Sequence, residues 1–209
     1  LKLLILSEGC YLSKENAHAF ANMPELRELE IWPNADFSFS IVSMLQKNEK
    51  LQSLRLNDSK SAFINLEKLG LLTSLVEITV GSDYDDPGEM EIKGEQFASF
   101  ENLQKLERIY ISNAIDWDGA LEHFRHLSRL NNLSCANGVL SGKGMEYLSE
   151  CRQLRYLTIS ADSSFNDDDL RKLSKLAFLT KLGTDNCQTI TGAGFQDLES
   201  CGHLQSLSI

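Results

Sequence analysis

The chain has 209 residues, 42% hydrophobic and 24% charged, which is enough for one ordinary domain or for a solenoid of eight to nine turns. Its net charge of −10 argues against nucleic acid or an anionic membrane as the main partner and favours a partner that carries basic groups. No signal peptide is visible, and no apolar run reaches the roughly eighteen residues of a membrane span.

One pattern recurs along the whole chain. A leucine is followed by two residues, an aliphatic residue, one further residue and then an aliphatic residue, cysteine or threonine. Nine copies begin, in order, at Leu1, Leu26, Leu51, Leu75, Leu106, Leu130, Leu154, Leu179 and Leu204. Successive copies are 24 or 25 residues apart, except for the 31 residues between Leu75 and Leu106. A fixed period in this range indicates a solenoid, in which each repeat packs against its neighbours.

Each copy is predicted to open with a short strand. Because side chains alternate along a strand, Leu54 and Leu56 face inward, whereas Ser53 and Arg55 face outward. The same alternation gives five further inward pairs: Leu29 and Ile31, Ile78 and Val80, Ile109 and Ile111, Leu157 and Ile159, and Leu207 and Ile209.

A short helix is predicted before each new copy. Apolar residues stand nine, six and three positions before the first leucine of each copy after the first, and Asn48 is the one break in this set. Residue types that cap helices precede these segments, at Ser13, Ser38, Asp118, Ser141, Asn166 and Thr191. We therefore expect a helix to begin at or just after each of them.

Together these features resemble leucine-rich repeat proteins. The run Cys187-x-x-Ile190-Thr191-x-x-Gly194, followed by Leu198 and Cys201, resembles the cysteine-containing subclass known from F-box substrate receptors. The resemblance covers residues 1–209 as a single domain of about eight repeats. It implies an α/β solenoid with a concave parallel sheet and short convex helices. Neither end carries a polar cap, and Leu3 and Ile5 are apolar at outward positions, so we expect a fragment of a longer chain.

The five cysteines are interpreted as packing residues. They are Cys10, Cys135, Cys151, Cys187 and Cys201, an odd number without a C-x-x-C pair. Cys151 and Cys201 stand two repeats apart, roughly 10 Å by strand spacing, which is beyond disulfide reach. Unpaired cysteines favour a reducing, cytoplasmic compartment. A catalytic role is an alternative for Cys187, which precedes the expected helix near Thr191, although the subclass pattern implies a packing role there.

No cofactor, metal site or enzyme activity is predicted. His123 and His126 lie three residues apart beside Glu122, but a metal needs three or four converging ligands, so a solvated convex surface is the preferred interpretation. Motifs of hydrolases, phosphate-binding loops and zinc proteases are absent from the sequence.

The longest copy carries an acidic insertion with Asp83, Asp85, Asp86 and Glu89. A solvated loop is the preferred interpretation. A second contact for the partner is the main alternative, because insertions in repeat proteins often map to one functional face. A calcium site is the remaining one, although the EF-hand spacing is absent.

The concave face is the predicted binding surface, because Trp, Tyr and Arg are enriched at binding hot spots. The outward strand positions place there Glu28, Glu30, Trp32, Arg55, Glu77, Arg108, Tyr110 and Tyr156. We therefore expect a non-enzymatic module that recognises a protein partner. The alternatives are a substrate-receptor subunit of a ubiquitin ligase, the sensor region of a multidomain receptor, and a structural spacer.

Overall fold

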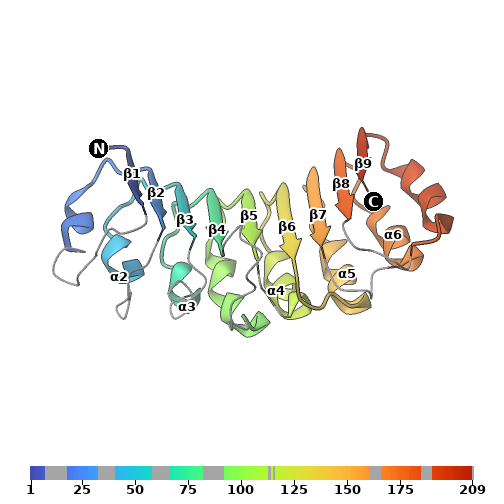
Figure 1. Ribbon diagram of the computed structural model, residues 1–209, viewed down its shortest axis with the longest axis horizontal. Coiled ribbons are helices and arrows are strands. Elements are labelled where there is room, and N and C mark those ends of the chain that lie inside the picture. Colours follow the sequence, from blue (N-terminus) through green and yellow to red (C-terminus); the bar gives the residue numbers. More distant parts are fainter. Residues whose placement is uncertain are drawn as a thin grey trace.

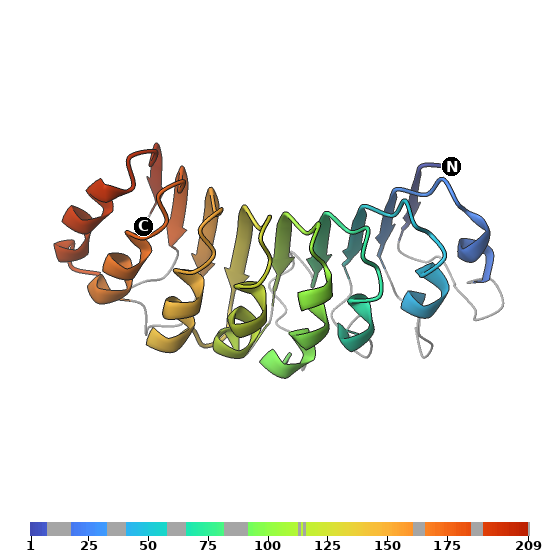
Figure 2. The same ribbon diagram turned by 180° about the vertical axis from the view of Figure 1, so that it is seen from behind.

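The computed structural model describes residues 1–7, 18–32, 41–57, 66–81, 92–112, 114, 116–160, 166–184 and 190–208. Within them, a single nine-stranded parallel sheet follows the order of the chain, and the helices line the opposite side of a shallow arc (Figures 1 and 2). The strands are β1 (Leu3–Leu6), β2 (Glu28–Ile31), β3 (Ser53–Leu56), β4 (Glu77–Val80), β5 (Arg108–Ile111), β6 (Asn132–Ala136), β7 (Tyr156–Ser160), β8 (Lys181–Thr184) and β9 (Ser206–Ser208).

The helical side is built from short elements. The α-helices are α2 (Ile41–Leu45), α3 (Leu66–Leu69), α4 (Trp117–Phe124), α5 (Gly142–Leu148) and α6 (Asp167–Leu173). The 3-10 helices are η1 (His18–Asn22), η3 (Gly94–Asn102) and η4 (Ala193–Ser200). None is longer than nine residues in the described part of the chain, as expected for elements that must fit within one repeat.

The strands align in the register that the repeat predicts. Leu54 of β3 lies beside Leu29 of β2 and Ile78 of β4, so equivalent inward side chains form continuous rows. These rows are buried between sheet and helices, and Leu54, Ile78 and Ile109 are 0% exposed. Stacked apolar rows therefore make up the core, and the predicted solenoid is confirmed.

Aromatic rings and cysteines complete this core. Phe97 lies edge-on to Phe100 and Phe124, with ring centroids 5.2 and 5.3 Å away, so the rings fill the space beneath the longest repeat. Cys151 and Cys201 occupy the slot that leucine takes in neighbouring repeats, and both are buried and unpaired, as is Cys135. Cys10 and Cys187 lie outside the described residues.

Two of the expected helix caps are confirmed. Ser141 and Asn166 precede α5 and α6, and their side chains accept hydrogen bonds from the N–H groups of Lys143 and Asp168. Ser13 and Ser38 lie outside the described residues.

The predictions for Asp118 and Thr191 were wrong. Asp116 caps α4 instead, and its Oδ1 accepts from the Gly119 N–H at 2.9 Å. Asp118 lies inside the first turn, where its carboxylate accepts from the N–H groups of Ser141 and Gly144 in the next repeat. Local sequence cannot reveal such a contact, because the donors come from a helix more than twenty residues later.

Thr191 lies one residue too early, since Gly192 is the residue that precedes η4. The Thr191 N–H donates to Asp167 of α6, and so does the Gly194 N–H, both at 3.2 Å. Asp167 therefore serves η4 as Asp118 serves α5, and a carboxylate in one repeat satisfies the helix start of the next.

Candidate binding surface on the concave sheet

The exposed face of the sheet holds a shallow pocket over β2–β5. Its volume is 320 Å³, and its lining residues are Glu30, Trp32, Arg55, Asn57, Glu77, Thr79 and Tyr110. Outward strand positions supply five of them, and Trp32 and Asn57 directly follow β2 and β3 and continue the same alternation. Five of the eight predicted residues thus line one pocket.

Glu77 lies at the centre of this surface. Its Oε1 accepts from the Arg55 Nη2 at 2.8 Å, and its Oε2 accepts from the Arg108 Nε at 2.7 Å. Burial alone would raise the pKa of Glu77, but the hydrogen bonds from the two guanidinium groups outweigh it and hold this pKa below its ordinary value of 4.5. The same hydrogen bond raises the pKa of Arg55. Glu77 and Arg55 are therefore both charged at neutral pH.

Glu30 extends the polar network to the far wall. Its Oε1 accepts from the Trp32 Nε1 at 2.5 Å and from the Asn57 Nδ2 at 3.2 Å, and its Oε2 lies 3.7 Å from the Arg55 Nη1. Arg55 thus links both carboxylates. The Trp32 indole is held in place by a hydrogen bond, which reduces the conformational freedom that it would lose on binding.

Tyr110 closes the pocket on the β5 side. Its hydroxyl accepts from the Asn132 Nδ2 at 2.7 Å. Burial, with a smaller contribution from the charge of Glu77, raises the pKa of Tyr110 above its ordinary value of 10.0, so the phenol is neutral at physiological pH.

Other predicted residues lie apart from the pocket. Arg108 reaches it only through Glu77, while Glu28 is exposed on β2 and Tyr156 is 47% exposed on β7. The acidic insertion with Asp83, Asp85, Asp86 and Glu89 lies outside the described residues.

Asn57 and Thr79 line the pocket, although neither was singled out from the sequence. Thr79 stands at an outward position of β4, and Asn57 directly follows β3 at the next outward position. Their position was the only feature of the sequence that could have identified them as pocket residues, since their side chains are neither charged nor aromatic.

The histidines and cysteines of the described residues were the remaining candidates for reactive groups. His123 Nδ1 lies 2.7 Å from Glu101 Oε1, and no three His, Cys, Asp or Glu side chains in the described ranges are arranged to hold a metal ion. Burial raises the pKa of the Cys151 thiol to about 12 and that of Cys135 well above its ordinary value, so both are protonated and poor nucleophiles.

Neither a protein-family model nor the sequence of a curated protein matches this chain. Solved structures do match. An internalin (inlF) from Listeria monocytogenes superposes with a TM-score of 0.55 at 16% identity, over 91% of this chain and 56% of its own. Internalin C2 from the same organism superposes with a TM-score of 0.56 at 14% identity, over 98% of this chain and 76% of its own. The chain has the leucine-rich repeat fold.

At sequence identities this low, the similarity to the internalins establishes the fold of this leucine-rich repeat solenoid but does not identify a binding partner. The chain spans a little over half the length of the first of them, 56%. In the described part of the solenoid, no helix has the length and apolar character required to cross a membrane.

Proposed function

We propose that this leucine-rich repeat solenoid is a non-enzymatic recognition module that binds a protein partner through the concave sheet face. The pocket over β2–β5 carries the proposal, because it combines Trp32 and Tyr110 with a connected set of charged groups. Trp, Tyr and Arg contribute most strongly at protein interfaces, above all where water is excluded around them.

The two rings are suited to act as anchors. Trp32 and Tyr110 are half-buried. The Trp32 indole donates a hydrogen bond to Glu30, and the Tyr110 hydroxyl accepts one from Asn132, so both rings are held in place. Ordered aromatic side chains bury a large area while losing little additional entropy when a partner binds.

The ion-paired groups would set the orientation of the partner. The side chains of Arg55 and Arg108 remain 47% and 38% exposed while they hold Glu77, so their outer N–H groups still face solvent. Charged groups of this kind contribute to selectivity and association rate more than to affinity. Glu28 and Tyr156 would extend the contact along the sheet, and the acidic insertion at residues 83–91 would add a second one.

We further propose that the solenoid belongs to the cysteine-containing class of leucine-rich repeats and works in the cytoplasm. Cys151 and Cys201, buried in equivalent slots, agree with the cysteine-containing repeat pattern and with a reducing, cytoplasmic compartment. A substrate-receptor subunit of a ubiquitin ligase or a receptor sensor would use the same concave face to recognise its target.

A peptide-display selection tests the binding face directly, because the selection itself supplies the ligands. Peptides selected on the wild-type protein are titrated against Trp32→Ala/Tyr110→Ala and against the control Leu71→Ala/Val139→Ala, whose side chains are more than half exposed outside the sheet. We expect the pocket variant to lose about tenfold or more in affinity and the control to retain it. Selected peptides that bind the pocket variant as tightly as the wild type would refute the concave-face proposal, provided that circular dichroism shows it folded.

A further inference from the structure

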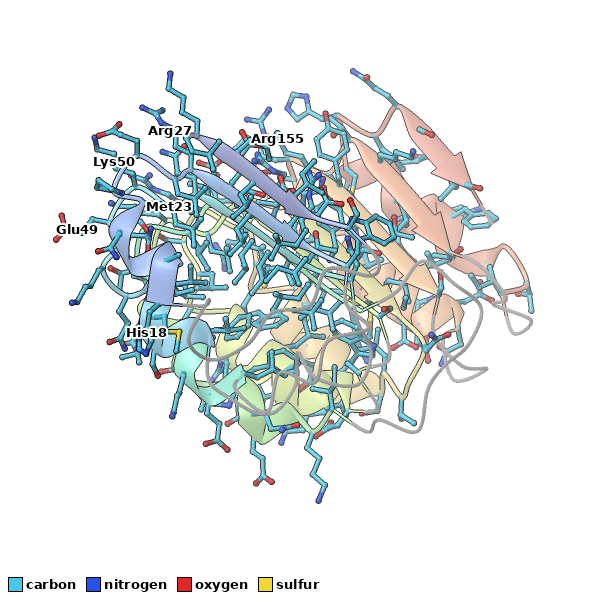
Figure 3. The ribbon with its side chains drawn as sticks, turned by 60° about the vertical axis from the view of Figure 1, so that its left-hand side comes forward. His18, Met23, Arg27, Glu49, Lys50 and Arg155 are labelled. Carbon is cyan, nitrogen blue, oxygen red and sulfur yellow. The ribbon has the colours of Figure 1, made fainter. Side chains whose placement is uncertain are left out.

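A second surface borders the concave face where β5–β8 begin. We call it the basic rim, and it consists of the exposed side chains of Lys105, Arg129, Arg152, Arg155 and Lys181. Each lies within two residues of the first leucine of its repeat. Figure 3 shows Arg155 at the edge of the sheet where the strands begin, on the same side as Arg27.

Neighbouring repeats bring these residues together. The Lys181 N–H donates to the Arg155 carbonyl at 2.9 Å, and the Arg155 N–H donates to the Asn131 carbonyl at 2.8 Å. Because adjacent strands lie about 4.8 Å apart, the four repeats place their cations along about 14 Å of the edge.

The rim is basic although the chain has 30 acidic and 20 basic residues. Within two residues of the first leucines of the last five repeats stand six basic residues and one acid, Glu107. The same positions of the first four repeats hold three basic residues and four acids. The sheet edge is therefore polarised along the solenoid.

The charges of the rim are left available. Among the described residues, none of the five rim side chains forms an ion pair, whereas neighbouring Arg108 pairs with Glu77 and Glu107, and Arg125 pairs with Glu150. Tyr156 is a neighbour of two rim residues, since it follows Arg155 in the chain and is the register partner of Lys181. Its ring is 47% exposed and adds apolar area to the surface.

We infer that the basic rim binds an acidic segment of the protein partner while the pocket over β2–β5 holds another part of it. The inference rests on the proposed function. An extended segment rises about 3.3 Å per residue, so about five residues with two or three carboxylates would match the cations across β5–β8. A protein segment is favoured over nucleic acid because the net charge of −10 repels a long polyanion.

The test uses three labelled probes, namely hexaglutamate, hexalysine and hexathymidylate, titrated by fluorescence anisotropy at low and at physiological salt. The rim variant is Arg129→Glu/Arg155→Glu. The control is Lys47→Glu/Lys68→Glu, two exposed lysines on the helical side that form no ion pair in the described residues. Both variants lower the net charge equally, so a difference between their affinities for a probe shows that the position of the charges matters and not their number.

We expect hexaglutamate to bind the wild type more tightly than hexathymidylate, and to bind more weakly as salt rises. The rim variant should lose about tenfold in affinity, and the control should change by less than about twofold. Equal binding to the rim variant and the wild type would overturn the inference. Tighter binding of hexathymidylate would assign the rim to nucleic acid, and weaker binding of hexalysine to the rim variant than to the wild type would exclude an acidic partner.

The pocket variant Trp32→Ala/Tyr110→Ala separates this inference from the proposed function. It should bind hexaglutamate like the wild type while losing the display-selected peptides. If only the rim inference is wrong, the selected peptides still bind the pocket variant more weakly than the wild type. If the proposed function is wrong, they bind both equally well.

Discussion

Glu77 shows how far the environment of a single residue can be predicted from its position in a repeat. The alternation of the strand places it on the outward face with Arg55 and Arg108, and this was predicted. Yet it is only 8% exposed, because guanidinium groups from both neighbouring strands cover its carboxylate. The repeat fixes which residues share a face, but the rotamers that long side chains adopt decide which of them pair.

Replacing Glu77 by Gln should lower the stability of the solenoid. The variant leaves Arg55 and Arg108 close together without their shared carboxylate, so we expect a loss of about 1–3 kcal/mol near neutral pH, measured by urea unfolding. Glu28→Gln is the matched control, since Glu28 is exposed on the adjacent part of the same sheet, and it should change stability little.

The loss should also depend on pH in a defined direction. The pKa of Glu77 is lower in the folded protein than its ordinary value of 4.5, so its stabilising contribution is complete above that value. The contribution is lost as pH falls through the lower, folded-state pKa. The wild type and Glu77→Gln should therefore converge in stability under strongly acidic conditions, and a gap that stays constant with pH would contradict this assignment.

At the scale of elements, the helices depend on contacts between repeats. Asp118 of α4 accepts hydrogen bonds from the start of α5, and the Gly144 N–H supplies one of them at 3.0 Å. This close approach needs glycine, because a Cβ at Gly144 would lie 2.2 Å from the Asp118 Oδ1. Apolar spacing predicted that helices exist here, but not how closely they pack.

Two glycines of α5 provide a matched test. Gly144→Ala should destabilise the protein by about 1–3 kcal/mol, because the added methyl displaces Asp118 from its position at the start of α5. At Gly142 a Cβ would meet only the flexible Lys172 Nζ, 3.0 Å away, so Gly142→Ala should be neutral or stabilise the helix by up to about 1 kcal/mol. Thermal unfolding compares them, and equal melting temperatures would refute the close-packing argument.

For the whole molecule, the period of leucines was sufficient to predict the order and direction of the strands and the buried rows of β2–β8, whereas Leu207 of β9, predicted to face inward, is 41% exposed because no described repeat covers it. The candidate pocket was predicted less completely. Its aromatic and charged walls were expected, whereas Asn57 and Thr79 were not, and Tyr156 lies away from it. The difference is physical: burial of apolar rows follows from the repeat alone, but a pocket depends on how particular side chains of several strands fill the space above the sheet.

A solenoid stabilised by contacts between neighbours should lose protection unevenly when one row is broken. Leu133 of β6 is 0% exposed, and Leu133→Ala should cost about 2–5 kcal/mol by leaving a cavity. Hydrogen exchange followed by mass spectrometry should then show the largest acceleration in β5–β7 and a smaller one in β2. Leu207→Ala is the control, because this side chain is 41% exposed on β9 and its loss should affect exchange only nearby. Equal acceleration of all strands by Leu133→Ala would mean that the repeats unfold as one cooperative unit, and that coupling extends well beyond adjacent rows.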